Sequence, residues 1–324
     1  MRHMLTALVA AGTAFAALAT SGAARAEYPE RPITILVPWS AGGGTDATGR
    51  MIGRLMQDEL GVPVNVVNRT GGGGVVGHQA IASADPDGYT IGIVTVEIAM
   101  MHWVGLTDLT YEAYTPIALY NADPAGLSVH ADSPYESAGE FLEAAGENPG
   151  EMKGSGTGQG GIWHLALAGM LVEAGLEPNA VVWVPSQGAA PALADLAAGG
   201  IDVVTASVVE ARALREAGKI KVLAVMSDER LPAFPDVPTL EESGGPAWTT
   251  AAWRTVAGPK GLPEDVRSKL AAAMENIYQS DAFREFMENR GFAMTWAGPE
   301  GLAEHYAEAD ANYGKVLKAV GLAK

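Results

Sequence analysis

Three glycine-rich segments have the residue types and the spacing to bind a small anion. They span residues 40–46, 70–74 and 154–161, and each lies between a short β-branched run and a helical segment. Glycine lets backbone N–H groups turn toward a bound group, and the following helix adds its unpaired N–H groups and positive dipole end. Such a loop binds carboxylate, sulfate or phosphate, although any single one can also be an ordinary tight turn. Two such loops in different parts of the chain could hold one ligand from both sides.

Other kinds of site have weaker signals. The pattern GxGxxG occurs at residues 72–77 and 156–161, but neither copy has a convincing acidic ribose partner at the end of a second strand about 20 residues further on. No cysteine is present, and the histidines show no HExxH spacing, so neither a thiol nucleophile nor a metal site is indicated. The GxSxG nucleophile motif is also missing. We therefore expect no catalytic residues, no metal and no cofactor, with an exported α/β hydrolase as the less favoured alternative.

The elements that would position these loops alternate between strands and helices. In the first series, strands are expected at residues 33–37, 64–67 and 90–95, with helices at 46–60 and after 74. In the second series, strands are expected at 126–130, 152–155, 181–184, 201–205 and 221–226, with helices between them. Only one strand, at 252–257, is expected in the tail, before helices near 264–280, 282–290 and 299–320. This alternation predicts an α/β fold with parallel sheets and ligands bound at the carboxyl ends of strands.

The first 26 residues have the pattern of a signal peptide. Arg2 gives a positive start, residues 5–19 form an apolar run, and Ala24-Arg25-Ala26 has the small-x-small form of a cleavage site. Cleavage after Ala26 would remove two arginines and leave 19 basic side chains against 38 acidic ones, a net charge of −19. A surface of that sign repels phosphate backbones, so nucleic acid is not an expected partner.

The motifs occur in an order that resembles a known family. They are YPERPI (28–33), VPWSAGGGTD (37–46) with Arg50, VNR (67–69), PDGYT (86–90), GSGTGQGG (154–161) with His164, VP (184–185), GAAPALADL (188–196), GKI (218–220) and PDVPTL (235–240). Together they resemble the substrate-binding proteins of tripartite tricarboxylate transporters, also called Bug receptors. The resemblance covers essentially the whole chain after the leader.

That resemblance implies a two-lobed periplasmic binding protein of the type II, or Venus-flytrap, class. Each lobe would have a mainly parallel sheet, with a ligand cleft between the lobes. The first lobe is expected to comprise residues 27–125 and 227–324, and the second residues 126–226. Receptors of this kind close on a small carboxylate, held by backbone amides and bridging waters, and present it to membrane permease subunits. A monomer is expected.

The resemblance also implies the ligand-binding residues. The first half of the carboxylate clamp would be Ser40, Ala41, Gly42, Gly43, Gly44 and Thr45. The second half would be the 155–160 segment, with Ser155, Thr157, Gly158, Gln159 and Gly160. Four further residues at strand ends are placed to line the same cleft, namely Thr95, Gln187, Thr205 and Ser207.

Arg254 leaves the ligand class open. Its guanidinium could bind a distal carboxylate, which would favour a dicarboxylate or tricarboxylate, or it could form a salt bridge within the protein. In the second case a monocarboxylate or an aromatic acid fits better.

Trp39 and Trp163 flank two of the glycine loops and could either contact an apolar part of a ligand or belong to the core. A ligand sensor for a signalling system is compatible with the same fold.

Overall fold

The computed structural model describes residues 28–324, and residues 31–324 form one compact unit. The predicted signal peptide, residues 1–26, lies outside the described residues. Between residues 28 and 324, no helix has both the length and the apolar character needed to cross a membrane.

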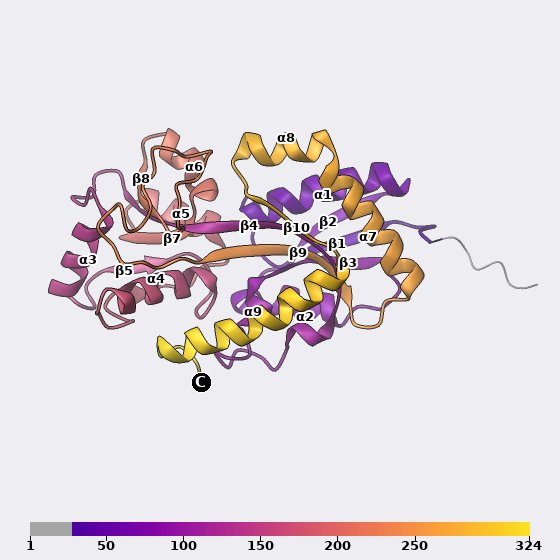
Figure 1. The fold of residues 1–324 in the computed structure, drawn as a ribbon, viewed down its shortest axis with the longest axis horizontal. Coiled ribbons are helices and arrows are strands. Elements are labelled where there is room, and N and C mark those ends of the chain that lie inside the picture. Colours follow the sequence, from indigo (N-terminus) through magenta and orange to yellow (C-terminus); the bar gives the residue numbers. More distant parts are fainter. Residues whose placement is uncertain (1–27) are drawn as a thin grey trace, which may run out of the picture. The chain divides into compact units, whose positions relative to one another are not determined.

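Ten strands and nine α-helices alternate along the described chain (Figure 1). The strands are β1 (Ile33–Val37), β2 (Val64–Asn68), β3 (Thr90–Thr95), β4 (Tyr114–His130), β5 (Lys153–Ser155), β6 (Val182–Trp183), β7 (Val203–Ser207), β8 (Ile220–Val225), β9 (Ala251–Pro259) and β10 (Met294–Ala297). The helices are α1 (Gly44–Leu60), α2 (Val75–Ala82), α3 (Ala138–Glu147), α4 (Ile162–Glu173), α5 (Ala189–Ala197), α6 (Val208–Glu216), α7 (Glu264–Gln279), α8 (Asp281–Arg290) and α9 (Pro299–Ala319). The predicted α/β alternation is confirmed.

The strands form a single mixed sheet in the order β2-β1-β3-β9-β4-β7-β5-β6, with β8 and β10 also paired to β4. Pairing is parallel for β1 with β2 and β3, and for β5 with β6 and β7. The strands β4 and β9 run antiparallel to their neighbours. The parallel pairing expected from the sequence therefore holds toward both edges of the sheet, and the two long strands add antiparallel ladders at its centre.

Strand β4 links two parts of this sheet. Its first part, from Tyr114 to Pro124, pairs with β9, and its second part, from Ala125 onward, pairs with β7 and β8. The sequence predicts a strand only at residues 126–130, which is the end of β4. The earlier part of β4 is not predicted because Asn121 and Asp123 are polar residues beside a proline, a combination typical of a turn. In the structure both side chains are buried within the strand.

Helices cover the sheet on both sides of its two parts (Figure 1). Helix α1 packs against β2 and α7, while α9 packs against β4. In the second part, α4 and α5 contact β7, and α6 contacts β8. Helix α1 ends as the sequence predicts, since Gly61 adopts the left-handed conformation with φ +71° directly after Leu60.

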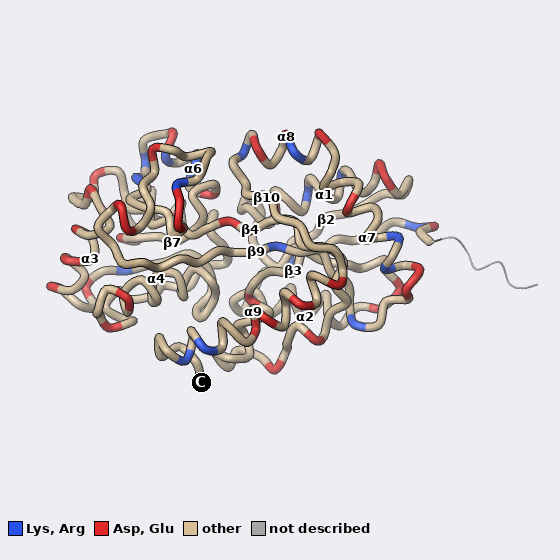
Figure 2. The backbone as a smooth tube through the Cα atoms, in the orientation of Figure 1, with Lys and Arg blue, Asp and Glu red and all other residues tan. Residues whose placement is uncertain are grey.

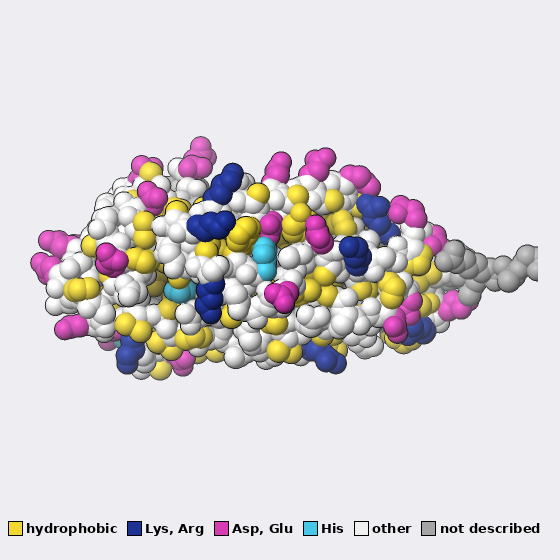
Figure 3. Space-filling model, turned by 90° about the horizontal axis from the view of Figure 1, so that it is seen from below, with side chains coloured by type: hydrophobic (Ala, Val, Ile, Leu, Met, Phe, Trp, Pro, Cys, Tyr) yellow, Lys and Arg dark blue, Asp and Glu magenta, His cyan; other side chains and the backbone are white. Residues whose placement is uncertain are grey.

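Charged residues occur mainly in the helices and loops (Figure 2). On the face shown in Figure 3, acidic and basic side chains are interspersed with apolar ones. The buried charged groups are few among the described residues, and Glu97 and Arg254 are two of them. Both lie where the two parts of the sheet meet, and they belong to the site described next.

Candidate functional site

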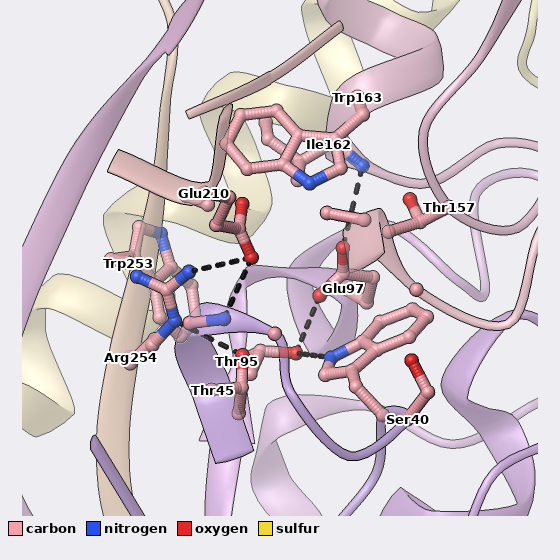
Figure 4. Close-up of a pocket in the computed structure, with 16 residues that line it drawn as sticks. Ser40, Thr45, Thr95, Glu97, Thr157, Ile162, Trp163, Glu210, Trp253 and Arg254 are labelled. Atoms are coloured by element: carbon pink, nitrogen blue, oxygen red, sulfur yellow. Dashed lines mark hydrogen bonds and ion pairs between the residues drawn. The ribbon is translucent and has the colours of Figure 1, made fainter. Parts of the chain in front are cut away.

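A small cavity of about 30 Å³ lies between the two parts of the sheet (Figure 4). Its walls come from the ends of strands, the beginnings of helices and the loops that join them. The lining residues are Trp39, Ser40, Gly43, Gly44, Thr45, Thr95, Glu97, Thr157, Ile162, Trp163, Gly188, Ala189, Glu210, Ala252, Trp253 and Arg254. Helix α1 begins at Gly44, helix α4 at Ile162 and helix α5 at Ala189, so three helix N-termini reach the cavity, with those of α1 and α4 on opposite sides.

The structure brings seven of the predicted ligand-binding residues to this cavity: Ser40, Gly43, Gly44, Thr45, Thr95, Thr157 and Arg254. Gly42 lies in a neighbouring groove of about 320 Å³ that Gly43, Gly44 and Glu210 also line. Ala41, Gln159 and Gln187 are exposed at the surface.

The other predicted residues are engaged in local structure. The hydroxyl of Ser155 donates to the carbonyl oxygen of Val184 at 2.7 Å, and that of Thr205 donates to the carbonyl oxygen of Trp163 at 2.6 Å. The Ser207 hydroxyl caps helix α6 and donates to Glu210. Two predicted glycines lie just outside the lining, where their backbone packs against loops of the first part of the sheet; they are Gly158 and Gly160. These residues stabilise the segments that form the cavity walls, but they do not line the cavity themselves.

Arg254 is the centre of a buried polar network. Only 2% of its surface is exposed, and its guanidinium donates to Asn121 and Asp123 on the adjacent strand β4. Its Nε donates to the hydroxyl of Thr45 at 3.0 Å, and its Nη2 lies 3.8 Å from Glu210 Oε1. Strand pairing places Arg254 directly opposite Asn121, which explains the contact. Of the two roles considered for this arginine, the structure therefore shows the internal salt bridge.

Glu210 joins the two sides of the cavity. Its Oε1 accepts a hydrogen bond of 2.9 Å from the backbone N–H of Gly44, the first residue of α1. Its Oε2 belongs to a capping box at the start of its own helix, with Ser207 as the N-cap. A carboxylate at a helix N-terminus is stabilised by the unpaired N–H groups and by the helix dipole. Glu210 thus serves two helix N-termini at once.

Glu97 occupies the equivalent position on the other side. It lies in a short 3₁₀ turn after β3, and its Oε1 accepts from the backbone N–H of Ile162, the first residue of α4, at 3.4 Å. Its other oxygen accepts from the Thr95 hydroxyl, which also accepts from the Trp39 indole at 3.1 Å. Burial raises the pKa of the Glu97 carboxyl above its usual value.

The histidines near the site are buried and neutral. His78 bonds to the backbone N–H of Thr95 at 3.1 Å, and burial lowers its pKa to about 4. His164 stacks on Trp183 with 4.7 Å between ring centroids, and burial lowers its pKa to about 4 as well. Among residues 28–324, no group of three or more histidine and acidic side chains could hold a metal ion.

Two hydroxyls at the cavity lack hydrogen-bond partners within the described part of the chain. They belong to Ser40 and Thr157, one from each side of the cavity. Thr157 is only 4% exposed, so water outside the protein does not compensate its hydroxyl. A buried hydroxyl without a partner is costly and marks a place where a polar ligand group or an ordered water would be stabilised.

The two sides approach each other closely around the cavity. The backbone N–H of Ser40 donates to the carbonyl oxygen of Gln187 at 3.2 Å. A methyl group on Gly158 would lie 2.3 Å from the Cα of Gly73, and one on Gly188 would lie 2.5 Å from Ser40 Oγ. Glycine is therefore required at both positions for this close approach. The predicted glycine loop at residues 70–74 also takes part here, because Gly73 contacts Gly158 in the 154–161 loop.

Sequence reasoning missed Glu97, Glu210, Gly188 and Trp253. One signal was available for Glu210, because Ser207 three residues earlier begins a capping-box pattern that indicates a helix start. That pattern does not reveal the contact with Gly44, which is 166 residues away in the sequence.

Comparison with known proteins agrees with this architecture. Residues 49–322 match the family model described as Tripartite tricarboxylate transporter family receptor. The chain belongs to this family. The UPF0065 protein in the tcbD-tcbE intergenic region of Pseudomonas sp. is 33% identical over 317 residues, which cover 95% of this chain and 93% of that protein.

Two solved structures share the fold. The periplasmic binding protein BugD is 29% identical with a TM-score of 0.85, covering 92% of this chain and 100% of that chain. A protein from R. palustris, solved with adipate, is 29% identical with a TM-score of 0.86, covering 91% of this chain and 99% of that chain. The fold of this family member is thus that of a two-lobed periplasmic binding protein, and it is a solute-binding receptor.

Proposed function

We propose that this receptor captures a small carboxylate in the cavity between its two lobes. The observation that carries the proposal is the convergence of the α1 and α4 N-termini on one buried cavity that also contains the unpartnered Thr157 hydroxyl. Helix N-termini bind carboxylates through their unpaired N–H groups and positive dipole ends. The adipate in the R. palustris structure supports a carboxylate as the ligand class.

The size of the cavity requires that the lobes open before a ligand binds. About 30 Å³ has room for one or two water molecules and is too small for a dicarboxylate. We propose that residues 27–125 with 227–324 move as one lobe and residues 126–226 as the other. The ligand then stabilises a closed form through contacts to both lobes, which the open form cannot make.

The position of Arg254 determines whether it can bind a second carboxylate of the ligand. The sequence favours a dicarboxylate or tricarboxylate only if this arginine faces the ligand. Arg254 lines the cavity, but its guanidinium already pairs with Asp123 and lies near Glu210. A second ligand carboxylate would have to compete with these two acids, so we propose that the helix N-termini hold the ligand's main carboxylate.

We further propose that the protein is exported after cleavage at Ala26 and acts as a monomer. It would deliver its ligand to the membrane permease subunits of a tripartite tricarboxylate transporter, with no chemical conversion. The family to which the chain belongs and the periplasmic description of BugD support this role.

A thermal-shift screen of residues 27–324 tests the proposed function. The panel comprises monocarboxylates, dicarboxylates, tricarboxylates, amino acids and aromatic acids, with the amide or alcohol analogue of each acid as its control. Because a ligand that binds only the folded state raises the Tm by mass action, at least one acid should raise it while its neutral analogue does not. Equal shifts for acids and neutral analogues, or no shift with any acid, would contradict a carboxylate receptor.

A further inference from the structure

Two acidic side chains cap helices across the cavity in a reciprocal way. Glu210 from α6 accepts from Gly44 at the start of α1, and Glu97 from the turn after β3 accepts from Ile162 at the start of α4. In Figure 4 both carboxylates point into the cavity from opposite sides. The chain's own carboxylates therefore occupy the two helix N-termini that the proposed function assigns to the ligand.

The charges around the cavity are unbalanced. Three buried or nearly buried acids, Glu97, Asp123 and Glu210, face a single cation, Arg254. Asp123 is the direct partner of this cation, since it accepts a hydrogen bond from Nη1, whereas Glu210 lies 3.8 Å from Nη2. Burial also weakens screening by solvent, so an added negative charge is repelled more strongly here than at the surface.

When a ligand carboxylate takes the place of one of these side chains at a helix N-terminus, the displaced glutamate stays in the site. Its oxygens accept hydrogen bonds and cannot donate them while the group is ionised. A second ligand carboxylate would add a like charge beside it. A ligand ammonium group would instead supply both a positive charge and hydrogen-bond donors.

We propose that Glu97 and Glu210 determine specificity for carboxylates that also carry an amine, that is, small zwitterionic amino acids, over plain diacids. The ligand carboxylate binds at a helix N-terminus, and its ammonium group contacts the glutamate released from that position. The tryptophans that line the same cavity, Trp39, Trp163 and Trp253, are compatible with a cationic group, because indole faces attract cations. This proposal rests on the proposed carboxylate-receptor function and specifies its ligand class.

Isothermal titration calorimetry with pairs of acids that differ only in the amine tests this proposal. The pairs are succinate with aspartate, glutarate with glutamate, and propionate with β-alanine, each titrated into residues 27–324 at neutral pH. The amine-bearing member of at least one pair should bind ten times more tightly or better. If the diacids bind equally well or more tightly, the specificity proposal is overturned while the receptor function stands. If no acid binds, both fail.

Two nearly isosteric variants assign the effect to the glutamates. E97Q and E210Q remove one charge each without removing the side-chain bulk, and at least one should reduce the preference for the amine tenfold or reverse it. The exposed Glu151→Gln serves as the matched control and should keep the wild-type preference. Circular dichroism and the Tm establish that each variant folds. If both variants fold and retain the full preference, these glutamates do not set specificity.

Discussion

Replacing Gly158 with alanine should prevent the two lobes from closing. A Cβ at this position would lie 2.3 Å from the Cα of Gly73 and 3.3 Å from its backbone N and C atoms. Because the obstacle is backbone of the facing loop, no side-chain rotation can relieve the contact. The backbone of Gly158 has negative φ, so alanine introduces no local strain of its own.

The size of the effect follows from the contacts that closure makes. An ordinary carbon–carbon contact of about 3.5 Å requires the loops to separate by about 1 Å. That displacement would break or weaken the hydrogen bonds from Gly44 to Glu210 at 2.9 Å and from Ile162 to Glu97 at 3.4 Å. Each bond to a charged group contributes about 1.5–3 kcal/mol. In the bound form a ligand carboxylate takes one of these two N–H groups and a glutamate keeps the other, so the loss of one bond of this kind removes about 1.5–3 kcal/mol from the closed form, or about 10- to 150-fold in ligand affinity.

Small-angle X-ray scattering and calorimetry measure the two consequences of this substitution. G158A should show a larger radius of gyration than the wild type and a Kd raised by the factor given above. The matched control is G200A, because Gly200 does not line the cavity and a methyl group there meets only an ordinary contact, 3.5 Å from the Asp195 carbonyl oxygen. A G158A protein with wild-type scattering and affinity would refute the inference that this approach limits closure.

Three further predictions concern single residues of the site. T157V replaces the unpartnered hydroxyl with a methyl group, so carboxylate affinity in calorimetry should fall about tenfold, as expected for one hydrogen bond of about 1.5 kcal/mol. The Tm without ligand should be equal to or above that of the wild type, because a costly buried hydroxyl is removed. Equal affinity would exclude a ligand contact by this hydroxyl. R254Q leaves Asp123 buried without its cation, so the free energy of unfolding measured in urea should fall by about 3–5 kcal/mol. A fall of less than about 1 kcal/mol would show that the protein does not need this ion pair for its stability. His164 has a pKa lowered by burial to about 4 from 6.5, so the unfolded chain binds more protons between these values. This histidine alone should lower the free energy of unfolding by about 3 kcal/mol as the pH falls through that window, in addition to the like contribution of His78. H164Q separates this effect from that of His78, which acts in the same direction, and from that of Glu97, whose raised pKa acts in the opposite direction; the same pH slope in wild type and H164Q would contradict the assignment.

Local signals in the sequence sufficed for the glycine loops and for most helices and short strands. The turn at Gly61 and the loops before α1 and α4 depend on residues close together in the chain, so their chemistry can be read directly. Seven of the predicted ligand-binding residues line the cavity for the same reason, since strand ends and helix starts of an α/β fold meet at one edge.

Contacts between segments far apart in the chain were not predictable in this way. Asn121 and Asp123 resemble turn residues until the strand that carries Arg254 lies beside them. Glu97 resembles a surface acid, yet it is 2% exposed because the α4 N-terminus covers it. Each of these placements depends on segments more than 60 residues apart, and a single sequence carries no record of such pairings.

The strand order also constrains how this molecule can assemble. Strand β9, which contains residues 251–259, lies between β3 and β4, although those two strands precede it by more than 120 residues. A chain that ends before Ala251 would leave the facing edges of β3 and β4 without a partner for their backbone N–H and C=O groups. The part of the sheet that contains β3, β9 and β4 therefore cannot be completed until nearly four-fifths of the polypeptide exists, and its folding must be a late event relative to synthesis.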